Sequence, residues 1–174
     1  KWMSKSGCRV ITFGVESLDE KILKTAKKNI TIEQVKRAVE ICRKYKIRSQ
    51  LHLIFGLPGE SEETIKNTIK RVIKLDPDYA QFYCAVPFPG TEFREYVLKK
   101  GYLQKVPWER YEINNALVSY PNLSSKKIQD GRKAAYRKFY FRPKYILRKM
   151  KEFPVKEWKK ISIQAFNFFR GWVF

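Results

Sequence analysis

One stretch, Leu51 to Ser61, limits what this chain can fold into. It reads Leu-His-Leu-Ile-Phe-Gly-Leu-Pro-Gly-Glu-Ser, so a short, mostly apolar run stops at glycine and proline. Such a run is typical of a buried strand. Pro58 supplies the φ of the first central turn position, Gly59 the positive φ of the second, and Ser61 a cap for a helix that begins with acids. The stretch therefore predicts a strand-to-helix junction of a βαβ unit, where parallel α/β folds place their ligands.

The same order of strand, turn and helix occurs three times along the first hundred residues. Strands are predicted over 10–15, 47–55 and 79–86, with helices that follow Ser17, Ser61 and Thr91. A further helix is predicted from Thr31, because Thr31 and Gln34 fit a capping box. Each connection is long enough for a right-handed crossover between parallel strands. The pattern predicts an α/β fold with a parallel sheet.

The pattern changes after about Leu103, so we predict a first unit over 1–103 and an irregular, helical extension over 104–174. Within the extension, Ser124 or Ser125 can cap a helix that Pro143 interrupts. A basic amphipathic helix is predicted over residues 155–172. Its apolar side is predicted to carry Trp158, Ile161, Ala165, Phe168, Phe169 and Trp172. This helix could dock on the rest of the protein, on a partner protein or on a membrane surface.

Composition excludes some classes and leaves others open. A hydrophobic content of 44% over 174 residues argues against disorder. The net charge of +20 is spread along the chain, which fits binding to nucleic acid or anionic membrane, a general lysine bias, or a protein whose acidic portion lies outside this sequence. Three widely separated cysteines match neither a disulfide framework nor a zinc spacing. Together with the lack of a signal peptide and of a membrane-spanning run, they predict a cytoplasmic protein.

Three short motifs follow the three predicted strands and would line one end of a barrel. They are Gly14-Val-Glu-Ser17, Gly56-Leu-Pro-Gly-Glu60 and Pro87-Phe-Pro-Gly-Thr91. Singly, each is explained by turn and cap chemistry. Their order, with the Lys27-Lys28 pair and Ile54 two residues before Gly56, resembles the second half of the radical S-adenosylmethionine (radical SAM) barrel over about Gly7 to Leu103. The resemblance implies a partial (β/α) TIM-type barrel of about three parallel units, followed by an α-helical C-terminal extension.

The resemblance also implies a site for S-adenosylmethionine. By this likeness Glu16 and Ser17 hold the ribose and methionine, for which a carboxylate and a hydroxyl are suitable partners. Ile54 and Gly56 match the strand that packs against adenine, and Val86 and Pro87 match further adenine contacts. His52 stands where the family pattern often has glycine. As the only histidine, it is either a catalytic candidate or a barrel-lining residue satisfied by hydrogen bonds.

The Cys-x-x-x-Cys-x-x-Cys loop that ligates the family's [4Fe–4S] cluster is missing. Cys8, Cys42 and Cys84 lie on different predicted elements, whereas a cluster needs thiolates close together. We therefore expect a C-terminal fragment, inactive alone, whose partner is the N-terminal half of the same protein. The full-length enzyme is expected to bind the cluster and cleave S-adenosylmethionine to a 5′-deoxyadenosyl radical. Its small-molecule or lipid-like substrate is unidentified.

A cofactor beyond S-adenosylmethionine is implied by the extension. Trp108-Glu-Arg-Tyr111 and Phe139 to Tyr145 resemble the tail of family members that carry an N-terminal cobalamin-binding domain. With cobalamin, methylation and oxidative cyclisation are two outcomes. The competing hypotheses are a degenerate relative without the cluster, and a basic RNA- or anionic-membrane-binding module. We expect no specific nucleic-acid partner and place any peripheral membrane contact at 155–172.

Overall fold

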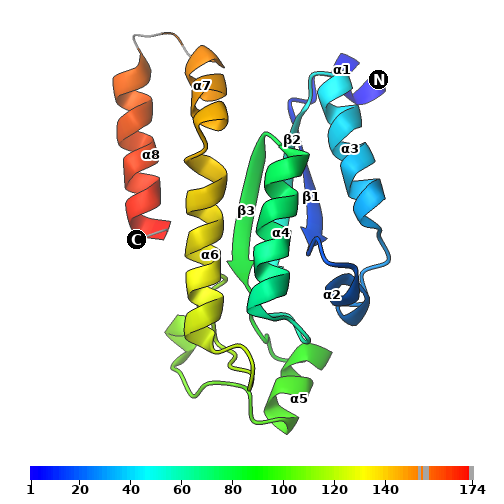
Figure 1. Ribbon diagram of the computed structural model, residues 1–174, viewed down its shortest axis with the longest axis vertical. Coiled ribbons are helices and arrows are strands. Elements are labelled where there is room, and N and C mark those ends of the chain that lie inside the picture. The colour runs from blue at the N-terminus through cyan, green and yellow to red at the C-terminus, as the bar shows by residue number, and fades with distance from the viewer. Residues whose placement is uncertain (153, 155–156, 173–174) are drawn as a thin grey trace.

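The computed structural model describes residues 1–152, 154 and 157–172, without the side chains of 159, 161, 165, 168, 169, 171 and 172 (Figure 1). Its elements, in chain order, are α1 (Trp2–Lys5), β1 (Val10–Glu16), α2 (Glu20–Thr25), α3 (Ile32–Lys44), β2 (Arg48–Phe55), α4 (Glu62–Leu75), β3 (Tyr79–Cys84), α5 (Glu92–Lys99), a 3₁₀ turn (Trp108–Arg110), α6 (Ser125–Tyr140), α7 (Pro143–Glu152) and α8 (Trp158–Trp172). The predicted alternation of strands and helices is confirmed.

The three strands form one parallel sheet in the order β1–β2–β3. Because the strands are parallel, their carboxyl ends lie at the same edge of the sheet, and so do the loops that follow them. The backbone of Ala85 extends this pairing past β3 by donating to the carbonyl of Phe55 at 2.7 Å. The predicted α/β fold is confirmed, and its three strand-end motifs meet at one edge.

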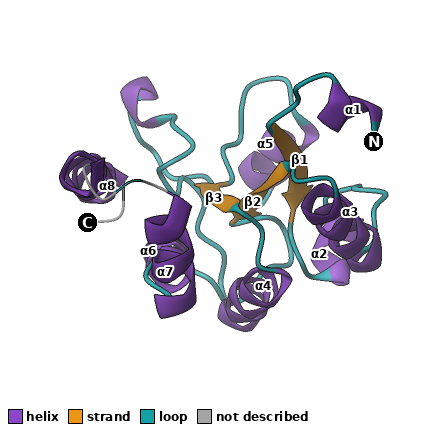
Figure 2. Cartoon of the chain, turned by 90° about the horizontal axis from the view of Figure 1, so that it is seen from above, coloured by secondary structure: helices purple, strands orange, loops and turns teal. Residues whose placement is uncertain are grey.

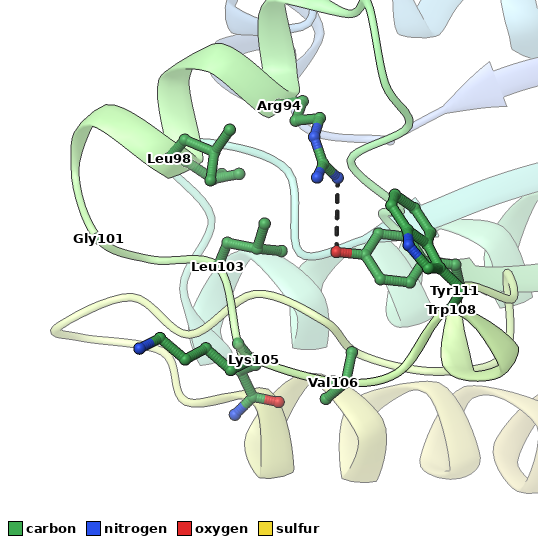
Figure 3. Close-up of a pocket in the computed structure, with 10 residues that line it drawn as sticks. Arg94, Leu98, Gly101, Leu103, Lys105, Val106, Trp108 and Tyr111 are labelled. Atoms are coloured by element: carbon green, nitrogen blue, oxygen red, sulfur yellow. Dashed lines mark hydrogen bonds between the residues drawn. The ribbon is translucent and has the colours of Figure 1, made fainter.

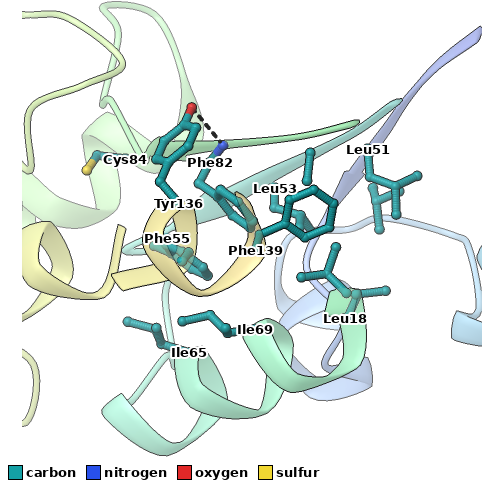
Figure 4. Close-up of a cluster of buried hydrophobic side chains, with 14 of the residues drawn as sticks. Leu18, Leu51, Leu53, Phe55, Ile65, Ile69, Phe82, Cys84, Tyr136 and Phe139 are labelled. Carbon is teal, nitrogen blue, oxygen red and sulfur yellow. Dashed lines mark hydrogen bonds between the residues drawn. The ribbon is translucent and has the colours of Figure 1, made fainter. Parts of the chain in front are cut away.

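The two faces of the sheet differ in burial. Along β2, Leu51, Leu53 and Phe55 are buried while His52 and Ile54, which alternate with them, are half-buried. Viewed from above, α3, α4 and α6 lie along the buried face (Figure 2). The side chains of Ile65 and Ile69 from α4, and of Tyr136 and Phe139 from α6, pack there onto β2 and β3 (Figure 4).

Helix α6 belongs to this core although it comes from the predicted extension. The ring of Phe82 on β3 lies 5.1 Å from Tyr136 in an edge-to-face contact, and 6.0 Å from Phe55 in a stacked one. Such aromatic pairs add to the free energy gained by burial. The hydrophobic core thus crosses residue 103, and the domain boundary predicted there stays a prediction.

Side chains from α6 also satisfy the outer edge of β3, the edge away from β2. The hydroxyl of Tyr136 accepts from the backbone of Phe82 at 3.2 Å. The hydroxyl of Tyr140 accepts from the backbone of Ala80 at 3.2 Å and donates to its carbonyl at 2.7 Å. Arg132 donates to the carbonyl of Phe82 at 3.0 Å. The backbone groups that an edge strand leaves for a further strand are therefore already paired.

Local chemistry explains most helix starts. Thr31 with Gln34 forms the predicted capping box, Ser61 caps α4, and Ser124 caps α6. The prediction that Ser17 caps a helix is wrong: Asp19 caps α2, because its carboxylate accepts from the backbones of residues 21 and 22. The displacement follows from a bulge in β1, where Glu16 takes a left-handed φ of 66° and delays the turn.

The ends of two other elements differ from prediction. Strand β3 ends at Cys84, not at 86, and the backbone N–H of Cys84 donates to the carbonyl of Ile113 at 2.7 Å. Helix α6 ends at Tyr140, and Pro143 then begins α7, a position where its missing N–H costs nothing.

Helix α8 is present over Trp158–Trp172 and lies beyond α6, away from the sheet, in both views (Figures 1 and 2). Of its predicted apolar side, Ile161, Ala165, Phe168, Phe169 and Trp172 have side chains outside the described residues, so that side stays a prediction. Within the described part of the chain, no helix is both long and apolar enough to cross a membrane.

Candidate functional site

The loop after β2 is the most tightly built of the three strand-end motifs. The backbone of Glu60 donates to the carbonyl of Leu57 at 3.1 Å and closes the predicted turn, in which Gly59 has a φ of +85°. The buried carboxyl group of Glu60 folds back and accepts from the backbones of Gly56 and Leu57. Burial raises the pKa of Glu60 to about 8, against the opposing effect of these backbone donors. Its Oε1 has no hydrogen-bond partner among the described residues.

The loop after β1 presents a half-buried carboxylate. Glu16 pairs with Lys28 at 2.9 Å, and its side chain is 23% exposed. Lys27, the other member of the predicted pair, contacts Glu92 at the start of α5. Ser17 is buried, and its hydroxyl accepts from the backbone of Asp19 at 3.1 Å. Of the two residues predicted at this position, Glu16 is accessible and Ser17 serves the start of α2.

A polar cluster lies on the half-buried face of the sheet. The side-chain amide of Gln50 lies 2.8 Å from Nε2 of His52, and the hydroxyl of Tyr83 donates to Gln81. The rings of His52 and Tyr83 meet edge to face at 5.2 Å. Burial lowers the pKa of His52, while the charge of Glu16 raises it. His52 is thus a face-lining residue with a hydrogen-bond partner, and a catalytic role for it stays a prediction.

A cavity of about 720 Å³ lies between α5 and residues 101–111 (Figure 3). Arg94 joins the two: its guanidinium donates to the carbonyl of Pro87 at 3.0 Å and to the hydroxyl of Tyr111 at 3.4 Å. The same group lies 5.3 Å from the centre of the Trp108 ring, a cation–π distance. Arg94 carries no local sequence signal, since its partners are seven or more residues away along the chain.

The structure brings some predicted site residues together and separates others. Glu16 is the last residue of β1, Gly56 and Pro87 follow β2 and β3 at the same carboxyl edge of the sheet, and Val86 is half-buried. Ile54 lies on the same half-buried face as His52. Two residues to which the sequence analysis assigns no role hold the middle loop. Glu60, which the motif contains, accepts from the backbone of Gly56, and the hydroxyl of Tyr120 donates to the carbonyl of Gly56 at 2.8 Å.

The cysteines do not form a metal site. Cys42 and Cys84 are buried, and burial raises the pKa of each thiol, to about 12 for Cys84. In the described ranges, no three histidine, cysteine or acidic side chains come close enough to hold a metal ion. These residues therefore do not fit an iron–sulfur cluster, which needs clustered thiolates.

Comparison with known proteins gives one family. The model of the Radical SAM superfamily matches residues 1–72. An uncharacterised methyltransferase of Pyrococcus horikoshii is 35% identical over 85% of this chain and 32% of its own length. Bacteriochlorophyllide d C-12(1)-methyltransferase of Chlorobaculum tepidum is 27% identical over 73% of this chain and 28% of its own length.

A solved structure agrees in fold. Coproporphyrinogen III oxidase from Escherichia coli, described as a radical SAM enzyme, superposes with a TM-score of 0.55. The match covers 79% of this chain and 27% of the oxidase at 17% identity, so it supports the fold alone. The chain spans about a third of the length of the curated relatives it matches.

Proposed function

Because this chain belongs to the radical SAM superfamily, we propose that it is the part of a radical SAM enzyme that completes the binding site for S-adenosylmethionine. One observation carries the proposal: Glu16, Gly56 and Pro87 lie at the ends of three neighbouring strands, at the carboxyl edge of one parallel sheet. In barrels of parallel strands this edge is where substrates and cofactors bind.

The residues present suit an adenosyl ligand. Glu16 offers a partly exposed carboxylate for hydroxyl or ammonium groups. Reductive cleavage of S-adenosylmethionine to a 5′-deoxyadenosyl radical needs electrons from a [4Fe–4S] cluster. We place the ligands of that cluster in another part of the protein, since the described cysteines are dispersed.

Methyl transfer is the outcome that we favour for the full-length enzyme. Two of the curated relatives that match this chain are named methyltransferases. A cobalamin cofactor is the finer part of this proposal and rests on the likeness of Trp108 to Tyr111 and of Phe139 to Tyr145 to the tails of cobalamin-dependent members. Oxidative cyclisation is the alternative outcome.

The test is to extend the reading frame upstream of Lys1, purify the full-length protein without oxygen, and measure its iron content and absorption spectrum. We expect about four irons per chain and a broad band near 400 nm, as for a cuboidal cluster. A reductant should then release 5′-deoxyadenosine from S-adenosylmethionine. The 174-residue chain, purified in the same way, is the matched control and should bind no cluster. An iron-free full-length protein without clustered cysteines would contradict the proposal.

A further inference from the structure

We propose that Tyr120 is a positioning residue. Together with Glu60, it holds the loop at Gly56 in the shape that binds S-adenosylmethionine. The inference rests on the proposed function and deepens it. It assigns to the segment between α5 and α6 a part in ligand binding that neither the strand-end motifs nor the family match over residues 1–72 assigns.

The two side chains fix Gly56 from opposite ends. The backbone N–H of Gly56 donates to the carboxylate of Glu60, and the carbonyl of Gly56 accepts from the hydroxyl of Tyr120 at 2.8 Å. One bond holds the peptide that precedes Gly56, and the other holds the peptide that follows it. Gly56 sits between them with a φ of +91°, a conformation open mainly to glycine.

Apolar contacts from the same segment close one side of the loop. A Cβ atom added to Gly56 would lie 3.2 Å from the side chain of Ile128 at the start of α6, and 3.5 Å from that of Val118. Tyr120 is itself held, because its backbone donates to Leu123 at 3.0 Å and its ring meets Tyr102 edge to face at 5.3 Å. The hydroxyl is therefore presented to Gly56 by a supported turn.

A loop held in this way offers a preformed surface. Residues 57–59 of the loop are half-buried or exposed, and a ligand that contacts them binds without the entropy cost of ordering the loop. Loss of one hydrogen bond in such a support corresponds to about 1 kcal/mol, or about fivefold in a dissociation constant. The family-like residues of the loop would thus reach full affinity only when Tyr120 is in place.

The experiment measures S-adenosylmethionine affinity by calorimetry in the full-length protein that carries its cluster. Tyr120→Phe keeps the ring and removes only the hydroxyl, so we expect the dissociation constant to rise about fivefold to tenfold. Glu60→Gln keeps an oxygen that can accept from Gly56 and should bind within about threefold of the unchanged protein, whereas Glu60→Ala should lose tenfold or more.

Tyr140→Phe is the matched control. Its hydroxyl also bonds a strand backbone from the extension, but at Ala80 near the start of β3. This variant should lose thermal stability and keep its affinity. Hydrogen exchange of the peptide over 56–61 adds a second readout, which should become faster in Tyr120→Phe and not in Tyr140→Phe.

The outcomes separate the two proposals. If the unchanged protein does not bind S-adenosylmethionine, the proposed function is wrong, and this inference with it. If it binds and Tyr120→Phe binds equally well in a folded state, only the positioning role is wrong. If Tyr120→Phe does not fold, the comparison of Glu60→Gln with Glu60→Ala decides, and equal affinities for those two overturn the inference.

Discussion

At the scale of single residues, His52 is a titratable group on the half-buried face of the sheet, so its pKa depends on the environment of that face. Its ring lies between Gln50 and Tyr83, and burial favours the neutral form. A nitrogen of Gln50 can only donate, so Nε2 of the neutral ring accepts and the ring proton is on Nδ1. The nearby charge of Glu16 opposes the effect of burial.

We predict that His52 titrates below 6.5, and that Glu16→Gln lowers its pKa further because the charge that favours the imidazolium is lost. Since the folded state binds this proton more weakly than the unfolded chain, the contribution of His52 to stability falls as pH drops below 6.5. Nuclear magnetic resonance of the only histidine measures the pKa directly. Glu33→Gln, an exposed change on α3, is the control. A pKa that rises in Glu16→Gln would contradict the assignment.

The site was predictable at the residue scale only where the signal is local. Pro58, Gly59 and Ser61 behave as their turn and cap chemistry predicts. Ser17 does not, because the bulge at Glu16 shifts the start of α2 to Asp19. Tyr120 could not be found, since it bonds to Gly56 across 64 residues and no local pattern marks that contact.

At the scale of elements, one carboxylate joins α4 to α7. Asp76 ends α4 in a left-handed conformation with a φ of 50°. Its oxygens lie 3.3 Å from Arg142, 3.2 Å from Lys144 and 3.0 Å from Arg148. Burial raises the pKa of Asp76, but the three cations outweigh it and hold the pKa below its usual value.

We predict that Asp76→Asn lowers the free energy of unfolding by about 2–3 kcal/mol, less than for a fully buried pair, because two guanidinium groups lose their counter-charge. Asparagine tolerates the left-handed conformation, so the change tests charge and not backbone strain. Lys144→Ala is the control: its side chain is 81% exposed and should contribute less than about 1 kcal/mol. Urea unfolding of both variants measures the difference, and equal losses would count against the network.

The order of elements was predictable because each helix start and each apolar run is encoded within a few residues. The packing of α6 was not. Its residues contact β3 from 45 to 60 positions away, as Gln129 does with Cys84 and Tyr140 with Ala80. The pattern of strands and helices in the sequence changes near residue 103, yet the hydrophobic core contains residues from both sides of that position. The periodicity of a sequence predicts a helix but not the surface on which the helix packs.

At the scale of the whole molecule, the sheet has two different edges. The outer edge of β3 is occupied by hydroxyls and a guanidinium from α6, whereas β1 pairs with β2 alone among the described strands. Tyrosine hydroxyls thus take the place of a neighbouring strand.

We predict that the double variant Tyr136→Phe and Tyr140→Phe accelerates hydrogen exchange at the amides of Ala80 and Phe82 by about tenfold, since each loses its acceptor. Tyr145→Phe is the control, because its hydroxyl donates to the carbonyl of Asp78 and contacts neither amide. Exchange that stays equal in the two variants would show that another group protects this edge.

The occupied outer edge of β3 also limits how this sheet can be extended into a barrel. A sheet that accepts no neighbour beyond β3 cannot close into a ring through that strand. A barrel that continues from β1 therefore keeps a lateral opening at β3, next to α6.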